Sequence, residues 1–194
     1  MERICVYCGS SPGPDPAYRE AAEAFGRTLA ERDLGLVFGG GHVGLMGAVA
    51  DATLAAGGGA YGVIPEALEE RELTHQGLTD LDVVGSMHAR KERMAQLADG
   101  FVALPGGFGT LEELMEVLTW AQLGFHRKPC GVLNVAGYYD SLAAFFDSQV
   151  EAGFVEPDHR EMLIVTDDAD ALLDRFAAYE PPPVKRVITD EEQT

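Results

Sequence analysis

The sequence predicts a single α/β domain in which a mostly parallel sheet of about seven strands carries helices on both faces. Short apolar runs alternate with amphipathic stretches along the whole chain. Two glycine-rich segments come directly after apolar runs, where the strand-to-helix turns of such folds lie. The chain has 194 residues, 46% of them apolar, which is enough for one complete core. The predicted arrangement is Rossmann-like, and ligands of such sheets bind at the carboxyl ends of the strands.

The individual elements follow from the periodicity of apolar residues. The predicted strands are short apolar runs at residues 3–8, 34–38, 60–64, 81–84, 101–104, 131–134 and 163–165. The predicted helices cover residues 17–32, 45–56, 87–98, 111–123, 139–152 and 169–178. Residues 1–180 are expected to form the domain. Residues 181–194 begin with three prolines and end in charged residues, so we expect an extended or disordered tail.

The charge balance restricts the partners. The formal net charge is −18 at pH 7. An acidic surface repels nucleic acid and anionic membranes, so neither is an expected partner. The first apolar run, residues 4–7, is too short for a signal peptide or a membrane span. We therefore expect a cytoplasmic protein whose anionic ligand, if it has one, binds where a few Arg and Lys side chains gather.

The three cysteines are Cys5, Cys8 and Cys130, and disulfides are not expected in a reducing compartment. Cys5 and Cys8 have the CxxC spacing of some metal and redox sites. In a strand, however, residues three apart point to opposite faces, and no second cluster supplies further ligands. Buried, inert thiols are the favoured interpretation, a metal or redox role is the alternative, and no metal is expected.

The first glycine cluster is GGGHVGLMG at residues 39–47, between the second predicted strand and the second predicted helix. It predicts contacts from Gly39, Gly40, Gly41 and Met46 to a phosphate or a ribose. The alternative is structural, because glycines also permit a tight turn and close packing of a helix on a sheet.

This cluster also satisfies GxGxxG, which raises a dinucleotide-binding alternative. That fingerprint follows the first strand of its unit and has an acidic residue about 20 positions later, at the end of the next strand. Here the turn follows the second strand, and Glu66, near that distance, comes after Pro65 in a predicted loop. An NAD(P)-linked enzyme is therefore disfavoured, and the sequence has no GxxxxGK[ST] phosphate loop.

The second glycine cluster is PGGFGTLEE at residues 105–113, between an apolar run and an amphipathic run. The backbone N–H groups of such a turn point toward one place, and the helix N-terminus adds a positive dipole end. An anion, most often a phosphate, is expected there. Gly106, Gly107 and Gly109 let the backbone approach that ligand, and Thr110 offers a hydroxyl.

Two carboxylates, Glu112 and Glu113, follow this turn, and phosphate binding alone does not require them. They predict chemistry beside the phosphate. The alternative is a capping box, with Thr110 as the N-cap and Glu113 as its partner three residues later. A cap predicts that E113Q costs little activity, whereas a catalytic carboxylate predicts near-complete loss with the fold intact.

The third feature is SMHARKERM at residues 86–94, a predicted helix in which Met87 and Met94 lie on one apolar stripe. Arg90 and Lys91 border this stripe. Cations are costly to bury unless they are paired, which makes both candidates for binding an anion or a carboxylate. The alternative is that both side chains extend along their stems to solvent.

Together with CVYCGSSPG at residues 5–13, these segments resemble the LOG family, cytokinin-activating phosphoribohydrolases once labelled lysine decarboxylase-like. The patterns GGGxxGLMG, MHxRK and PGGxGTxxE occur in order, TWAQLG at residues 119–124 is similar, and the resemblance reaches about residue 152. One departure is Phe108, where many members carry tyrosine. The decarboxylase label is disfavoured because such enzymes use pyridoxal phosphate on a lysine, and Lys91 is the only well-placed one.

The resemblance implies hydrolysis of the N-glycosidic bond of an adenosine 5′-monophosphate, N6-modified or not, to the free base and ribose 5-phosphate. It implies a homodimer that needs no cofactor, with Arg90 and Glu113 as the catalytic pair. The implied substrate contacts are Glu72, Arg90, Lys91, Gly107, Phe108, Gly109, Thr110, Leu111, Glu112, Glu113 and Thr119. Gly106 joins the candidate phosphate or ribose contacts.

In this hypothesis the glycine turns and Thr110 hold the 5′-phosphate and thereby orient the sugar. Glu113 stabilises the positive charge that develops on the ribose or activates the attacking water, and Arg90 holds the nucleotide. The alternative is a nucleotide or cofactor carrier of the same fold without turnover, as in molybdenum-cofactor carriers. The presence of both Arg90 and Glu113 favours the enzyme.

Overall fold

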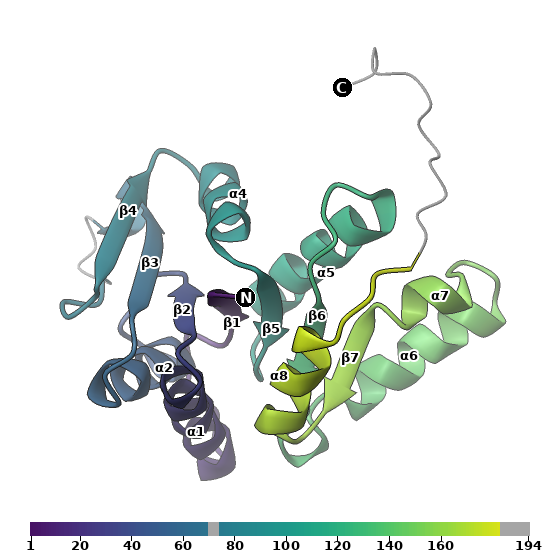
Figure 1. The fold of residues 1–194 in the computed structure, drawn as a ribbon, viewed down its shortest axis with the longest axis horizontal. Coiled ribbons are helices and arrows are strands. Elements are labelled where there is room, and N and C mark those ends of the chain that lie inside the picture. Colours follow the sequence, from purple (N-terminus) through teal and green to yellow (C-terminus); the bar gives the residue numbers. More distant parts are fainter. Residues whose placement is uncertain (70–73, 183–194) are drawn as a thin grey trace.

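The computed structural model describes residues 1–69 and 74–182 and contains one seven-stranded sheet in the order β4-β3-β2-β1-β5-β6-β7 (Figure 1). All pairs of neighbouring strands are parallel. The strands are β1 (Arg3–Tyr7), β2 (Gly35–Phe38), β3 (Ala60–Pro65), β4 (Asp80–Val84), β5 (Gly100–Ala103), β6 (Cys130–Leu133) and β7 (Leu163–Thr166). The predicted α/β class is confirmed.

Helices cover both faces of this sheet. They are α1 (Pro16–Glu31), α2 (Gly44–Ala55), α3 (Glu66–Glu69), α4 (Met87–Leu97), α5 (Phe108–Leu123), α6 (Asp140–Glu151), α7 (Pro157–Arg160) and α8 (Ala169–Ala177), with a 3-10 turn η1 (Val135–Gly137). Buried side chains of α1, α2 and α8 join one core cluster, and those of α4 and α5 join the cluster on the other face, where α6 also packs.

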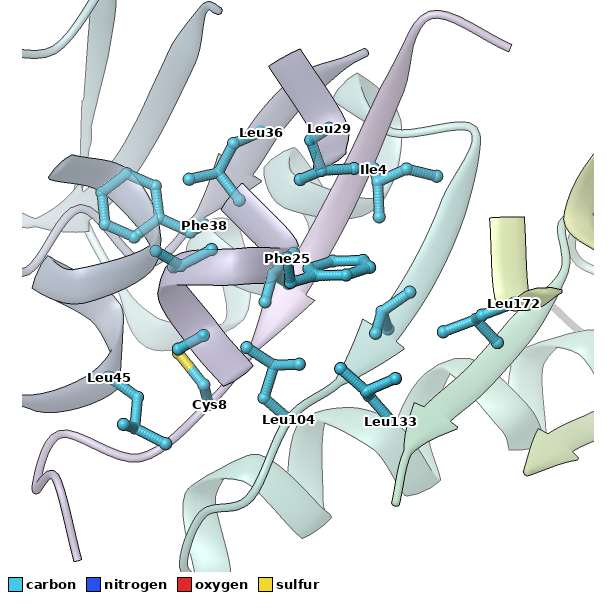
Figure 2. Packing of buried hydrophobic residues seen from close by; sticks show 14 of the residues in the cluster. Ile4, Cys8, Phe25, Leu29, Leu36, Phe38, Leu45, Leu104, Leu133 and Leu172 are labelled. Atoms are coloured by element: carbon cyan, nitrogen blue, oxygen red, sulfur yellow. The ribbon is translucent and has the colours of Figure 1, made fainter. Parts of the chain in front are cut away.

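The two clusters follow from the alternation of side chains along the strands. In β1, Ile4 and Val6 enter one cluster, whereas Cys5 and Tyr7 enter the other. Figure 2 shows the first cluster, where Phe25 of α1 lies among residues of the sheet. Burying such a side chain stabilises the fold by about 1.5–3 kcal/mol. Because both faces are covered, the inner strands are the nearly continuous apolar runs that identified them, whereas the edge strand β4 is only partly buried.

The cysteines belong to these clusters and are free and buried. Cys5 and Cys8 lie in different clusters, so the prediction that they point to opposite faces is confirmed. Burial raises the pKa of all three thiols, that of Cys130 to about 12. They are therefore protonated and unreactive at neutral pH.

The predicted bounds agree with the structure to within one residue for all seven strands, and for the helices with one exception. Helix α5 begins at Phe108, three residues earlier than predicted. The short elements α3, η1 and α7 were not predicted, and Glu66, expected in a loop, begins α3. Glu72 and most of the predicted tail, residues 183–194, lie outside the described residues. None of the helices in the described part of the chain combines the length and apolarity of a membrane span.

The sheet order places the expected ligand position of a doubly wound sheet at the carboxyl ends of β1 and β5. These neighbouring strands continue into α1 and α5, which lie on opposite faces of the sheet. Connections that leave toward opposite faces open a space between them, and ligands of doubly wound sheets bind in that space. The segments after both strands contact each other, because Gly9 N–H donates to the Pro105 carbonyl at 3.0 Å.

Candidate active site

The glycine-rich turn after β5 leads directly into α5. Gly107 occupies the N-cap position and has no side chain that could accept from the first turn of the helix. The first backbone N–H groups of α5 therefore lack a side-chain cap. With the helix dipole, these groups form a place for an anion.

The capping-box alternative is wrong. Thr110 is the third residue of α5, not its N-cap, and it is only 4% exposed. Its hydroxyl oxygen packs against Gly106, where an added Cβ would lie 2.1 Å from it. Glu113 is thus not placed by capping, and the structural explanation for this carboxylate is removed.

Gly107 and Gly109 are exposed, and their backbone angles do not demand glycine. A Cβ added at either position would meet no atom of the described residues within 4 Å. Packing inside the protein therefore gives no reason for glycine at either position. Close approach of a ligand to the backbone is a reason that remains.

Two tyrosines that follow β6 hydrogen-bond to the backbone of this turn. The Tyr139 hydroxyl donates to the Leu104 carbonyl at 2.6 Å, and the Tyr138 hydroxyl donates to the Gly106 carbonyl at 2.5 Å. Tyr139 is 2% exposed, while Tyr138 is partly exposed and meets Tyr18 edge to face. The turn is fixed before any ligand binds.

Arg90 reaches the sheet from α4 and is 9% exposed. Its Nε donates to the carbonyl of Val63 in β3 at 3.1 Å. The guanidinium lies against Gly39 of the first glycine turn, where an added Cβ would be 1.6 Å from Nη2. The alternative that this side chain extends to solvent is wrong, because Arg90 is buried against the Val63 carbonyl and the backbone of Gly39.

Glu113 faces Arg90 across the two helices. Its Oε1 lies 3.8 Å from Arg90 Nη1, and the side chains are 12% and 11% exposed. Burial raises the pKa of the Glu113 carboxyl from 4.5 to about 7, although the positive charge of Arg90 opposes this. Glu113 can therefore hold or release a proton near neutral pH, as a general acid or base requires.

Lys91 does not extend to solvent either. It is 7% exposed, and its Nζ donates to Glu112 and, at 3.0 Å, to Glu116 Oε1. Burial alone would lower the pKa of Lys91, but the hydrogen bonds to both carboxylates outweigh it and raise the pKa. Lys91 and Glu112, two predicted substrate contacts, are thus joined to each other.

The first glycine turn packs closely inside the protein. Gly40 and Gly44 have φ values of 74° and 60°, which favour glycine. An added Cβ would lie 2.3 Å from the carbonyl carbon of Ser10 at Gly44, and 2.0 Å from the carbonyl oxygen of His42 at Gly47. These contacts agree with the structural alternative for this cluster, in which the glycines permit a tight turn and close packing of a helix on the sheet.

The remaining candidates lie in different surroundings. Phe108 is 94% exposed beside Gly107, at the rim of the turn. Leu111 and Met46 pack against the two core clusters. Thr119 lies farther along α5, where its hydroxyl donates to the Met115 carbonyl at 2.7 Å. The structure therefore brings together Arg90, Glu113 and the β5 turn, but not Thr119.

The stripe predicted on α4 also needs a correction. Met94 and Ala98 are buried, but Met87 is 45% exposed. The sulfur of Met87 lies 3.9 Å from Arg90 Nη1. Met87 therefore borders the candidate site at the surface, while His88 is exposed as expected.

Another hollow, of about 950 Å³, opens beside the first glycine turn, between α2 and the segment before β4. Asp51, Glu69 and Asp80 are among its lining residues. These carboxylates repel a phosphate, so the hollow is a poor anion site. The Arg90–Glu113 pair beside the β5 turn is the better candidate.

Sequence reasoning missed Tyr138, Tyr139 and Glu116. Two adjacent tyrosines directly after a predicted strand were an available signal, since residues at that edge of the sheet surround the ligand crevice. Glu116 was detectable as the residue one helical turn after Glu112, on the same side of the helix.

A parallel α/β sheet with an uncapped helix N-terminus, a buried guanidinium and a carboxyl of near-neutral pKa is an arrangement typical of nucleotide-processing proteins. Residues 46–176 match the family described as "Possible lysine decarboxylase". A probable cytokinin riboside 5′-monophosphate phosphoribohydrolase of Oryza sativa subsp. japonica is 52% identical over 183 residues, 94% of this chain and 74% of that protein. A cytokinin riboside 5′-monophosphate phosphoribohydrolase of Arabidopsis thaliana is 52% identical over 181 residues, 93% of this chain and 83% of that protein.

The chain therefore belongs to the LOG family, as its motifs indicated. Among solved structures, a molybdenum cofactor carrier protein of Chlamydomonas reinhardtii superimposes with a TM-score of 0.69, covering 92% of this chain and 99% of that one. Its sequence identity is 22%, so this likeness shows the shared fold alone.

Proposed function

We propose that the chain hydrolyses the N-glycosidic bond of adenosine 5′-monophosphates, N6-substituted ones included, releasing the free base and ribose 5-phosphate. Water supplies the oxygen that bonds to C1′ of the ribose, and one of its protons ends on the departing base. Relatives about half identical to this chain are named cytokinin riboside 5′-monophosphate phosphoribohydrolases. The LOG resemblance implied the same reaction.

The observation that carries the proposal is the Glu113 carboxyl, buried 3.8 Å from Arg90 next to the helix N-terminus of α5. A phosphate-binding protein without turnover gains nothing from a buried carboxylate beside its anion, because like charges repel. An N-glycosidase needs that carboxylate, since the ribose becomes positively charged as the base departs.

The turn after β5 supplies the anchor. The uncapped N–H groups of α5 face the 5′-phosphate, and Gly107 and Gly109 leave the backbone open to it. Thr110 belongs to the same first turn of α5, so its backbone N–H is one of these groups. An anchor several bonds from C1′ orients the sugar, so that binding energy lowers the barrier at the reacting atom.

Glu113 and Arg90 act on the sugar and the water. With a pKa of about 7, part of the Glu113 population is ionised at neutral pH. The carboxylate accepts a proton from the attacking water or stabilises the developing cation. Arg90, fixed by Val63 and Gly39, keeps the carboxylate in place and offers a planar donor group to the nucleotide.

The assembly and location extend the proposal. We place the enzyme in the cytoplasm, where its three free thiols stay reduced, and we propose that it acts as a homodimer. Helix α6 has no fully buried residue in the single chain, and Phe145 and Phe154 are 56% and 84% exposed. A second copy is the natural cover for such apolar surface. Thr119, remote from Glu113 within one chain, is then a candidate to contact a substrate in the partner's site.

The test is a product assay. The protein is incubated with AMP, N6-isopentenyl-AMP and the two matching nucleosides, and free base and ribose 5-phosphate are quantified. We expect release from the monophosphates, little release from the nucleosides, and loss of about 10²–10³ in rate for E113Q. E92Q, which removes an exposed glutamate of α4 bonded to Gln96, is the matched control and should match the wild type.

Two results would contradict the proposal. Binding of a monophosphate without any base release would leave the carrier alternative. Equal release from nucleosides and monophosphates would remove the phosphate anchor from the mechanism.

A further inference from the structure

Five charged side chains meet where α4 and α5 pack on the same face of the sheet. Arg90 and Lys91 come from α4, and Glu112, Glu113 and Glu116 come from α5. Glu112 and Glu116 are four residues apart and lie one above the other on the helix, so one ammonium reaches both. The side chain of Glu113 points toward Arg90, the residue that precedes Lys91 on α4.

Lys91 is held more tightly than a substrate-binding lysine needs to be. Its side chain is 9% exposed, and its Nζ contacts both Glu112 and Glu116. A buried ammonium with two carboxylate acceptors is a charge-assisted, well-satisfied group. Moving Nζ to a phosphate would leave Glu112 and Glu116 facing each other without their cation.

The two ion pairs depend on each other because they join the same two helices. Arg90 and Lys91 are consecutive, as are Glu112 and Glu113. A shift of α4 along α5 that breaks the Lys91 contacts therefore also moves Arg90 relative to Glu113. The Arg90–Glu113 contact of 3.8 Å is too long for a hydrogen bond and does not fix its own geometry.

We propose that Lys91 and Glu116 are positioning residues, whose ion pair holds α4 against α5 so that Arg90 and Glu113 face each other at the β5 turn. This inference rests on the proposed function of Arg90 and Glu113. It assigns Glu116, which neither the motifs nor the LOG resemblance singled out, and it gives Lys91 a role other than a substrate contact.

The same pair sets the charge around Glu113. From α4, Arg90 and Lys91 lower its pKa, and from its own helix Glu112 and Glu116 raise it. Cys5 and Tyr7 of β1 and Cys8 just after it also interact with Glu113, and they are neutral because burial raises their pKa values. Burial remains the largest cause of the raised pKa of Glu113, and these four charged groups add to it or oppose it.

The substitutions that separate the two roles of Lys91 are K91M and E116Q. K91M keeps the apolar stem and removes the charge, and E116Q keeps an oxygen that accepts from Lys91. R93M is the matched control, because Arg93 lies on the same helix and pairs with Asp82 of β4 at 2.5 Å instead of with α5. Thermal unfolding of each variant checks that the fold is retained.

Kinetics with N6-isopentenyl-AMP give the first readout. A positioning role predicts that K91M and E116Q each lower kcat by between about tenfold and a hundredfold with KM nearly unchanged. The double variant K91M/E116Q should be no worse than K91M, because the two residues act as one unit. A substrate contact instead predicts that K91M raises KM and that E116Q resembles the wild type, and this result would overturn the proposal.

The pKa of Glu113 gives a second readout that needs no turnover. It is measured by carbon-13 NMR of protein labelled at the glutamate carboxyl carbon, with E113Q to assign the signal. Removing the Lys91 charge should raise this pKa by about one pH unit, and removing the Glu116 charge should lower it by a similar amount. R93M should leave it unchanged.

The two measurements distinguish the failure of this inference from the failure of the proposed function. Suppose that the wild type releases no base, but that K91M raises the pKa of Glu113 and E116Q lowers it. The hydrolase proposal then fails, and the coupling of the two ion pairs stands. If the wild type is active but neither K91M nor E116Q changes kcat or the pKa of Glu113, the positioning role is overturned.

Discussion

The two glycine-rich turns of this protein look alike in sequence but differ in what their glycines are for. In the turn after β2, an added Cβ at Gly39 or Gly44 would overlap Arg90 or Ser10. In the turn after β5, a Cβ at Gly107 or Gly109 would meet none of the described atoms. In the first turn, the space beside Gly39 is filled by the Arg90 side chain. In the second turn, the space beside Gly107 and Gly109 is open. Glycine alone therefore does not mark a ligand site, whereas glycine with unclaimed space is a stronger indication.

The difference also divides the chemistry between the turns. The Arg90 guanidinium packs against the first turn, and Glu113 lies on α5, the helix that follows the second turn. Arg90 and Glu113 meet because the sheet brings β2 and β5 to either side of β1. Four substitutions test this difference, each placed at or beside one of the two turns.

The largest expected effect comes from G39A. The new methyl group would displace the Arg90 guanidinium, the far end of a flexible side chain, so the fold should survive while the active geometry is lost. We expect kcat/KM to fall by about 10²–10³ with little change in melting temperature. Steady-state kinetics and thermal unfolding check this, with R90K for comparison. Wild-type activity in G39A would mean that Arg90 does not need its position over the first turn.

The second effect concerns the carboxyl that follows the other turn. A carboxyl whose pKa is raised in the folded state binds its proton more tightly there, so its stabilising contribution is present below pH 4.5 and is lost as the pH rises toward 7. E113Q has no proton to lose. It should therefore be more stable than the wild type above pH 7, by up to about 3 kcal/mol, and nearly equal to it at pH 4.5. Urea unfolding at several pH values measures the difference, and a gap independent of pH would contradict the raised pKa.

The third effect tests how the second turn is held. Y139F removes the donor to the buried Leu104 carbonyl and should lower the free energy of unfolding by about 1–3 kcal/mol. Y138F is the matched control, since its more exposed position lets water replace the hydroxyl. Chemical denaturation compares the two variants. An equal cost for both would show that burial of the Tyr139 bond is unimportant.

The smallest effect comes from filling the open space. G109A places alanine in the first turn of α5 without a clash, which should stabilise the fold by about 0.5–1 kcal/mol. If the phosphate approaches this backbone, the same methyl group should raise KM for the monophosphate several-fold. G85A, at an exposed glycine after β4 that also has free space, is the control and should leave KM unchanged. An unchanged KM in G109A would place the phosphate elsewhere.

Much of the fold was predictable because it depends on local signals. Strands β1, β2, β3, β5 and β6 are buried along most of their length, so each is a mainly apolar run between polar segments. The edge strand β4, DLDVV, is only partly buried. The start of α5 was misplaced because Thr110 resembles an N-cap, whereas Gly107 is the N-cap and Thr110 packs inward against Gly106. Short elements such as α3 and α7 have too few residues to show a period.

For the site, the sequence by itself determined which residue types follow the strands: two glycine turns, and, on the helices, two adjacent cations and two adjacent carboxylates. These follow from spacing along one strand, turn or helix. Only the tertiary structure decided which cation meets which carboxylate, and that Gly39 accommodates Arg90 while Gly109 accommodates no protein atom in the described residues. The physical reason is that helix and strand periods fix the direction of a side chain within its own element. The partner it meets depends on how α4 and α5 pack on the sheet.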